Sequence, residues 1–353
     1  MKNKMEKRII NVGITMGDAN GIGPEIIIKV LSDKRILELC NPIVYGNKSI
    51  LNQCIKDLQL GELKLQHIGH PNKANGKSAT LISVDSELKT AEYGNPTKAS
   101  ALCAYEALER AMKDLIDQEI DCLVTAPINK DNIQQTAFDF AGHTEYLEHK
   151  DGNSESLMLM VNDYSRIGLV TNHYSINEIS SLIKTDLILK KLSIFNKTLR
   201  NDFNIRKPKI AVLGLNPHSG DNGLIGLEEE KEILPAIQQS KTIGILAFGP
   251  YPADGFFGSG NFNEFDGVLA MYHDQGLIPA KMLSSGTGVN YTAGLSFIRT
   301  SPDHGTAMDI AGKGIANESS MRSAIYNAIE LSRTRLMNEE LIKNKLETSK
   351  NRA

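Results

Sequence analysis

Three short apolar runs, each followed within a few residues by a histidine, constrain the fold of this chain more than any other feature. The runs are residues 166–171 (RIGLVT), 209–215 (KIAVLGL) and 268–271 (VLAM), and the histidines are His173, His218 and His273. Apolar runs of this length, stopped by polar turns, are typical of buried strands in a parallel sheet. The carboxyl ends of neighbouring parallel strands meet at one edge of a sheet, so we expect the three imidazoles to lie together.

Three imidazoles with open coordination positions can hold a divalent metal ion that also contacts a substrate. A single histidine after a strand is more often a structural residue that is hydrogen-bonded to its surroundings. The interpretation as a metal site therefore depends on the same position being occupied three times. Imidazole ligands favour zinc or cobalt over magnesium on grounds of softness.

The stretch after His273 carries groups that suit anions. Lys281, Asn290 and Arg299 supply two cations and an amide, and a phosphate is the anion that they fit best. Residues 303–309 (DHGTAMD) follow another apolar strand, and a glycine-spaced AGKG segment follows at residues 311–314. Such a glycine-rich loop can approach a nucleotide closely.

Length, charge and cysteine spacing limit the class of protein. A chain of 353 residues exceeds the size at which one core keeps growing, so two domains are expected. The 39 basic and 42 acidic residues leave a net charge of −3, which gives no general attraction for nucleic acid or membrane. None of the four cysteines forms a CxxC pair, which favours reduced thiols in a cytoplasmic protein. The N-terminal segment has too few consecutive apolar residues for a signal peptide or a membrane span.

Other motifs are ambiguous when each is taken alone. Residues 17–25 (GDANGIGPE) form a glycine-rich turn into a helix, but the spacing matches neither GxGxxG nor GxxxxGK[ST]. His143 and Thr144 precede an expected helix, where a capping loop would explain them equally well. Asp254 follows an expected strand at 242–248 and a rigid two-proline turn, so it fits a turn role as well as a catalytic one.

Taken together and in order, seven motifs resemble the 4-hydroxythreonine-4-phosphate dehydrogenase family of vitamin B6 biosynthesis, from about Gly13 to Asn317. The motifs are GDANGIGPE, GHTEYL, GLNPHSGDNG, GPYPADGFF, AMYHDQGLIPAK, GVN and FIRTSPDHGTAMDIAGKG. That family is similar to the isocitrate and isopropylmalate dehydrogenases, so the resemblance implies an α/β fold of two α/β/α domains with the active site in the cleft between them. Residues 1–129 and 298–353 would form the nucleotide-binding domain, and residues 130–297 the metal, substrate and dimerisation domain.

The resemblance also implies roles for individual residues. The metal ligands would be His173, His218 and His273. The phosphorylated substrate would be bound by His143, Thr144, Lys281, Asn290 and Arg299. The nicotinamide cofactor, NAD or NADP, would be bound by His304, Gly305, Thr306, Ala307, Asp309 and Asn317. Asp254 and Asp274 are both expected near the metal histidines, and either could accept the substrate hydroxyl proton, directly or through water.

The implied reaction is the NAD-dependent oxidation of 4-phosphohydroxy-L-threonine, followed by decarboxylation to 3-amino-2-oxopropyl phosphate. One divalent metal per site (zinc, cobalt, magnesium or manganese) would assist both steps. The resemblance further implies a homodimer with the active site near the subunit interface. The middle segment, about Lys130 to Phe297, would form most of the interface. We expect no nucleic-acid or membrane partner.

Two local departures from the family pattern leave alternatives open. Ala19-Asn20 stands where Pro-Ala is usual, and Ser219-Gly220-Asp221 stands where Ala-Gly-Glu is usual. A related phosphorylated four-carbon acid, such as phosphothreonate or phosphoerythronate, is therefore an alternative substrate. A metal-dependent phosphate-ester hydrolase is an alternative of another class, because histidines and carboxylates could equally activate water. The loop from His304 to Asn317 argues against a hydrolase, and the intact motifs argue against a binding protein without activity.

Overall fold

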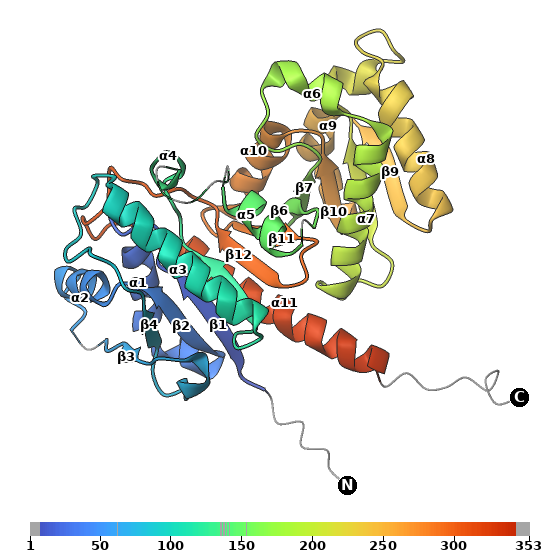
Figure 1. Ribbon diagram of the computed structural model, residues 1–353. Helices are drawn as coiled ribbons and strands as arrows, with labels where there is room; N and C mark the ends of the chain where they lie inside the picture. The colour runs from blue at the N-terminus through green and yellow to red at the C-terminus, as the bar shows by residue number, and fades with distance from the viewer. Residues whose placement is uncertain are drawn as a thin grey trace, which may run out of the picture.

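The computed structural model describes residues 8–61, 63–134, 136, 138, 140, 142–152 and 154–343 as one mixed α/β structure (Figure 1). The strands are β1 (Ile10–Thr15), β2 (Cys40–Gly46), β3 (Gln66–His67), β4 (Thr80–Ser83), β5 (Cys122–Thr125), β6 (Leu157–Val161), β7 (Arg166–Leu169), β8 (Lys209–Leu213), β9 (Leu246–Tyr251), β10 (Gly267–Ala270), β11 (Val289–Ala293) and β12 (Ile298–Pro302). The α-helices are α1 (Gly23–Ser32), α2 (Lys48–Asp57), α3 (Lys98–Ile116), α4 (Lys130–Ile133), α5 (His143–Lys150), α6 (Ile176–Leu182), α7 (Thr185–Asn201), α8 (Leu234–Thr242), α9 (Ala253–Gly258), α10 (His273–Ser284) and α11 (Ser319–Lys343).

The twelve strands of the described residues join one sheet, in the order β3-β4-β2-β1-β5-β12-β11-β6-β7-β10-β8-β9. At one end of the sheet, the neighbouring strands β3, β4, β2, β1, β5 and β12 pair in parallel. At the other end, β7, β10, β8 and β9 also pair in parallel. Between these two groups, β11 and β6 pair antiparallel with their neighbours. The predicted α/β fold is confirmed, and the change of direction at β11 marks the middle of the sheet.

In the first half of the sheet, alternate residues of each strand face different helices. On β5, Cys122 and Val124 belong to the core formed with α1 and α11, whereas Leu123 belongs to the core formed with α3. The same alternation on β2 sends Val44 to the first core and Ile43 to the second. This period of two is the side-chain geometry of a strand, and it explains why both faces carry helices.

The second half follows the same rule with other helices. On β8, Val212 packs in the core that includes α7 and α8, whereas Leu213 packs in the core that includes α9 and α10. Figure 1 shows α7 and α8 beside β9 and β10 in the upper part of the molecule. The strand expected at 242–248 begins later, because α8 continues to Thr242 and β9 starts at Leu246.

The sheet runs without a break across the boundary that the sequence predicts between two domains. Strands β1 to β5 and β12 form one half, and strands β6 to β11 form the other. The division into residues 1–129 with 298–353 and residues 130–297 follows these halves, and we retain it as a proposal. None of the described helices combines the length and the apolarity needed to cross a lipid bilayer.

Helix α10 packs unusually close to the sheet at Gly276. A Cβ atom at this position would lie 2.5 Å from Leu169 Cδ2 and 3.1 Å from Ala270 Cβ. Both neighbours are buried side chains of β7 and β10, so they have little room to move. Glycine therefore sets the distance at which α10 lies on these two strands.

We predict that Gly276→Ala destabilises the fold by roughly 1 to 3 kcal/mol through overpacking. The matched control is Gly255→Ala on α9, where an added Cβ would meet no atom within 4 Å. That control should leave stability unchanged or raise it by up to about 1 kcal/mol, because alanine favours the helix. Urea unfolding midpoints measure both variants, and equal shifts would show that the close approach of α10 is not a constraint.

Candidate active site

The three strands that precede the predicted metal histidines are neighbours in the sheet. Strand β10 pairs in parallel with β7 on one side and with β8 on the other, so their carboxyl ends share one edge. The Thr171 hydroxyl donates to the Met271 carbonyl at 2.7 Å, and the Gln275 amide donates to the Gly214 carbonyl at 2.6 Å. These bonds tie the strand ends together directly below the histidine loops.

Two of the three histidines lie side by side. The ring centroids of His173 and His273 are 5.6 Å apart. Asp274 Oδ1 lies 2.7 Å from His273 Nδ1, and a carboxylate only accepts, so in the neutral imidazole the proton is on Nδ1 and the lone pair is on Nε2. In metalloproteins, a carboxylate that is hydrogen-bonded in this way orients the histidine that binds the metal.

His218 lies in the loop after β8, where its φ of 53° places it in the left-handed region. Within the part of the chain that the structure describes, no group of three histidine, cysteine or carboxylate side chains is close enough to hold a metal ion. The structure therefore brings His173 and His273 together, and it places His218 on the adjacent strand end without closing the set.

A pocket of about 200 Å³ lies at the same edge, over the middle of the sheet. Its floor is one face of the four adjacent strands β5, β12, β11 and β6. The register places Asn290 opposite Ser301 and Thr292 opposite Met158, so these side chains lie on the same face of the sheet. The floor residues that line the pocket are Thr125, Met158, Asn290, Arg299 and Ser301. The floor thus includes the carboxyl ends of β5 and β12, the edge at which parallel strands of α/β sheets commonly bind ligands.

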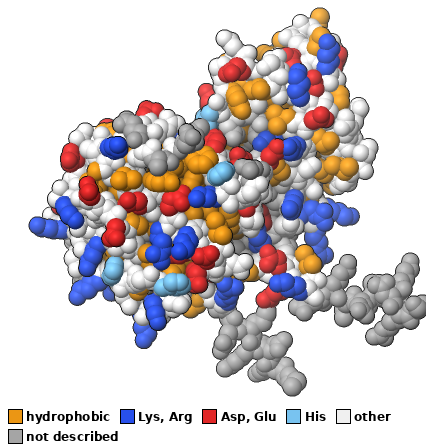
Figure 2. Space-filling view, in the orientation of Figure 1, with side chains coloured by type: hydrophobic (Ala, Val, Ile, Leu, Met, Phe, Trp, Pro, Cys, Tyr) orange, Lys and Arg blue, Asp and Glu red, His pale blue; other side chains and the backbone are white. Residues whose placement is uncertain are grey.

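The walls of the pocket come from loops that are distant in sequence. They include the first turn of α5, the Lys130 side chain, His173, and the loop of His304 and Gly305. Of the residues predicted for substrate, metal and cofactor, the pocket brings together His143, Thr144, His173, Asn290, Arg299, His304 and Gly305. Figure 2 shows histidine side chains at the surface where the molecule is hollowed between its two lobes.

Arg299 is the most unusual group in this pocket. Its side chain is 3% exposed, and its hydrogen-bond partners among the described residues are the hydroxyls of Thr125 (3.1 and 2.5 Å) and Thr292 (2.9 Å). Burial lowers the pKa of Arg299 to about 10, and no carboxylate of the described chain compensates its charge. A buried cation without a counter-ion is costly, so the site favours an anionic ligand.

Neighbouring histidines remain neutral for electrostatic reasons. Burial, with the positive charges of Arg299 and Lys130, holds the pKa of His143 well below its ordinary value. Burial, Lys130 and His273 lower the pKa of His173, while Glu145 opposes the shift. Neutral imidazoles can accept a hydrogen bond or bind a metal ion, whereas imidazolium cannot.

Several predicted residues lie outside the pocket. Lys281 forms an ion pair with Asp303 at 3.3 Å, and Asp274 contacts His273. Asp254 is exposed in the first turn of α9. The roles predicted for these three side chains remain predictions.

The predicted cofactor loop is fixed against the glycine-rich turn that precedes α1. The Ile22 N–H donates to the Thr306 carbonyl at 3.0 Å, and a Cβ at Gly21 would lie 2.9 Å from the same oxygen. Farther along, Lys29 Nζ donates to the Gly314 and Ala316 carbonyls at 2.9 and 2.6 Å. Glycine at position 21 is therefore required by packing, which explains a turn that matches no nucleotide fingerprint.

The other residues predicted to bind the cofactor differ in exposure and in backbone conformation. Ala307 has a positive φ of 42°, and Asp309 is exposed. Asn317 Oδ1 accepts from the Ser319 N–H at 2.8 Å, directly before α11. At Gly305 an added Cβ would meet open space, so the backbone there is accessible from the pocket.

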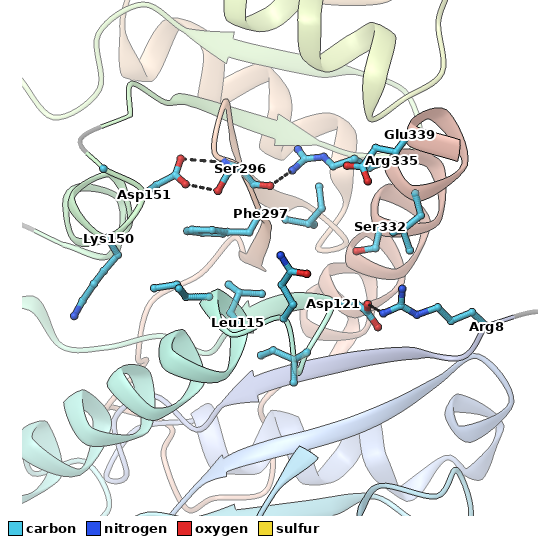
Figure 3. A pocket seen from close by; sticks show the side chains of 16 residues that line it. Arg8, Leu115, Asp121, Lys150, Asp151, Ser296, Phe297, Ser332, Arg335 and Glu339 are labelled. Atoms are coloured by element: carbon cyan, nitrogen blue, oxygen red, sulfur yellow. Dashed lines mark hydrogen bonds and ion pairs between the residues drawn. The ribbon is translucent and has the colours of Figure 1, made fainter. Parts of the chain in front are cut away.

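A larger cavity of about 610 Å³ lies at the opposite edge, beside the amino ends of β5 and β12 (Figure 3). Its basic side chains are already paired: Arg8 with Asp121, Lys150 with Glu109, and Arg335 with Asp202. Figure 3 shows Ser296 hydrogen-bonded to Asp151 and Arg335 in the same wall. With its cations compensated, this cavity is less suited to an anionic substrate than the smaller pocket.

The sequence interpretation assigned no role to Lys130, Glu145, Thr125 or Ser301, all of which line the pocket. Lys130 follows β5 at the carboxyl edge, which was the available signal. Thr125 and Ser301 are polar residues inside apolar strands, and only the register shows that they share a face with Arg299.

Comparisons with known proteins identify the family. A family model described as "Pyridoxal phosphate biosynthetic protein PdxA" matches residues 38–328. A 4-hydroxythreonine-4-phosphate dehydrogenase of Bacteroides thetaiotaomicron is 48% identical, covering 94% of this chain and 91% of the relative. A D-threonate 4-phosphate dehydrogenase of Cupriavidus necator is 40% identical, covering 92% and 98%.

Solved structures agree with this assignment. The crystal structure of a 4-hydroxythreonine-4-phosphate dehydrogenase from Klebsiella pneumoniae superimposes with a TM-score of 0.81 at 33% identity, covering 92% of this chain and 98% of that one. The family match extends over most of the chain, and the relatives are named as dehydrogenases, so the chain is an oxidoreductase. The chain belongs to the PdxA family of pyridoxal phosphate biosynthetic proteins.

Proposed function

We propose that this protein oxidises the C3 hydroxyl of 4-phosphohydroxy-L-threonine, with hydride transfer to NAD. The resulting β-keto acid loses CO2 and gives 3-amino-2-oxopropyl phosphate. The names of relatives such as the Bacteroides thetaiotaomicron enzyme support this substrate. The observation that carries the proposal is the buried Arg299 guanidinium, which lacks a counter-ion at the floor of a small polar pocket.

A phosphate supplies what Arg299 lacks. Its oxygens can accept charge-assisted hydrogen bonds from the guanidinium, and burial makes these bonds stronger than in water. Neutral His143, the Thr144 hydroxyl and the Asn290 amide line the same pocket and add uncharged hydrogen-bonding groups. Lys130 places a second cation at the rim, where the carboxylate end of the same substrate would find it. Binding at both ends would hold the reacting carbon in one position.

The donor set at the histidine edge fits a divalent metal ion. His173 and His273 are adjacent, and Asp274 leaves Nε2 of His273 available, so these two imidazoles with His218 would hold the ion. When bound, such an ion supplies positive charge that stabilises negative charge on the substrate oxygen in both steps. Zinc or cobalt suits imidazole ligands better than magnesium does. Asp274 would orient His273 in this arrangement. Asp254 and Asp274 both stay candidates to accept the proton of the substrate hydroxyl.

The loop from His304 to Asn317 is proposed to bind NAD or NADP. Three features support this proposal: the loop is hydrogen-bonded to Lys29 of α1, its backbone is open at Gly305, and its first residues border the substrate pocket. His304 Nε2 is buried without a hydrogen-bond partner among the described residues, which leaves it free for a ligand. A cofactor on this loop would lie next to a substrate bound at Arg299.

A related phosphorylated four-carbon acid is the second candidate substrate. The D-threonate 4-phosphate dehydrogenase of Cupriavidus necator is 40% identical to this chain. D-threonate 4-phosphate would use the same phosphate site and differ at C2, where a hydroxyl replaces the amino group. The hydrolase alternative lacks comparable support, because the relatives are named as dehydrogenases.

The proposed function predicts NADH formation, measured by absorbance at 340 nm, when protein, a divalent metal, NAD and 4-phosphohydroxy-L-threonine are combined. D-threonate 4-phosphate and the unphosphorylated 4-hydroxy-L-threonine are tested in parallel. We expect the highest kcat/KM with 4-phosphohydroxy-L-threonine and almost no activity with 4-hydroxy-L-threonine. Equal rates with and without the phosphate group would refute the proposal.

Mutations at Arg299 and at His304 should weaken the binding of different ligands. Arg299→Met removes the buried cation, and we expect a loss of roughly 2 to 4 kcal/mol in substrate binding with an unchanged Kd for NAD. His304→Ala should weaken NAD and leave substrate binding without cofactor nearly intact. Titration calorimetry of both variants measures these constants. If Arg299→Met weakened NAD as strongly as His304→Ala does, the guanidinium would belong to the nucleotide site.

We further propose a homodimer with the active site near the interface, formed mainly by residues 130–297. Exposed apolar side chains support this surface: Ile278 and Met282 on α10, and Leu224 and Ile225 in the loop before the π-helical turn Glu229–Ile233. Light scattering should return a dimer for the wild type and for Leu341→Asp on α11, and a shift toward monomer for Met282→Asp. A monomeric wild type at working concentration would contradict this proposal.

A further inference from the structure

Asp303 connects the proposed cofactor loop with helix α10. It directly precedes His304 in the proposed cofactor loop, and its Oδ1 lies 3.3 Å from Nζ of Lys281, the cation expected to bind phosphate. The Asp303 carboxylate is 13% exposed, whereas the Lys281 side chain is 54% exposed. A long, exposed lysine is thus attached at its tip to a nearly buried carboxylate.

Asp303 is itself held in place by three segments. Its N–H donates to the Ser320 hydroxyl at 2.9 Å, and that hydroxyl donates to the Gly288 carbonyl at 2.7 Å. A Cβ at Gly288 would lie 2.6 Å from Asp303 Oδ2, so the carboxylate packs directly against the start of β11. Asn290, on the floor of the pocket, is two residues farther along this strand.

Stability alone gives a poor explanation of this ion pair. A pair with one exposed partner contributes little to folding, because solvent screens it. Burial raises the pKa of the Asp303 carboxyl, which means that its charged form is disfavoured at this position, although Lys281 and His304 oppose the shift. The carboxylate occupies an unfavourable place and restrains a side chain that would otherwise be mobile.

We propose that Asp303 is a positioning residue that holds Lys281 beside the pocket, so that the ammonium is already placed for the substrate phosphate. The proposal rests on the proposed function, and on the expectation from the family resemblance that Lys281 also binds the substrate phosphate. A free lysine loses much rotamer freedom when it binds, and the ion pair has already removed part of that freedom. Lys281 Nζ has three donors, so it can retain Asp303 while it contacts a phosphate oxygen.

A double-mutant cycle with inorganic phosphate tests the proposal, with Kd measured by titration calorimetry on the full chain. Asp303→Asn keeps the shape of the side chain and should weaken phosphate roughly five- to tenfold, the loss expected when a lysine must be ordered on binding. In the Lys281→Met background the same change should have no further effect. Asp163→Asn, which removes an exposed carboxylate elsewhere, is the charge-matched control and should bind phosphate like the wild type.

A second readout separates positioning from a general loosening of the loop. Asp303→Asn should raise the KM of the phosphorylated substrate while kcat and the Kd for NAD stay near wild type, whereas a distorted loop would weaken NAD as well. Asp303→Ser provides an independent version of the same test should the asparagine variant fold poorly.

The outcomes distinguish this inference from the proposed function. Additive effects of Lys281→Met and Asp303→Asn, or an unchanged phosphate Kd in Asp303→Asn, would overturn the positioning role and leave the proposed function intact. Phosphate binding that is absent in the wild type or insensitive to Lys281→Met would overturn both the positioning role and the assignment of Lys281. If phosphate binds and the two mutations are not additive, but the phosphorylated substrate is not turned over, the positioning role is supported and only the proposed substrate is wrong.

Discussion

The buried positive charge of Arg299 is the constraint on which the site depends. The guanidinium is buried on one face of the sheet with two threonine hydroxyls as partners, and no carboxylate of the described chain neutralises it. Burying a cation in this way is unfavourable unless an anion arrives. The neighbouring groups also favour an anion. The charge of Arg299 helps to lower the pKa of His143, and Lys130 adds a second positive charge to the pocket wall. The fold supplies the position, since the floor lies where β12 meets the antiparallel strand β11.

Much of this arrangement was predictable from the sequence. Apolar runs stopped by polar turns indicated parallel strands, and the histidines after residues 166–171, 209–215 and 268–271 indicated that three of these strands are neighbours, which β7, β10 and β8 are. Both signals are local, because a buried strand needs apolar residues and its carboxyl end is open to ligands. The motifs around Arg299 and His304 likewise pointed to groups that now line one pocket.

The rest depends on distances that no local pattern contains. Lys281 was expected at the phosphate but contacts Asp303, because α10 and the loop after β12 approach each other only in the folded chain. Thr125 and Ser301 join the floor through strand register. The glycine-rich turn matched no nucleotide fingerprint, and the structure gives it another reason: Gly21 lies against Thr306 and supports the proposed cofactor loop. Residue type predicted the chemistry better than it predicted which groups are paired.

The most direct test of this account is a crystal structure of the protein with 4-phosphohydroxy-L-threonine and zinc, with anomalous diffraction measured at the zinc edge. We expect phosphate oxygens at hydrogen-bonding distance, about 2.7 to 3.2 Å, from the Arg299 guanidinium. We also expect one anomalous peak at the imidazoles of His173 and His273. A phosphate bound elsewhere, with Arg299 still contacting only Thr125 and Thr292, would contradict the central claim that substrate phosphate compensates this buried charge.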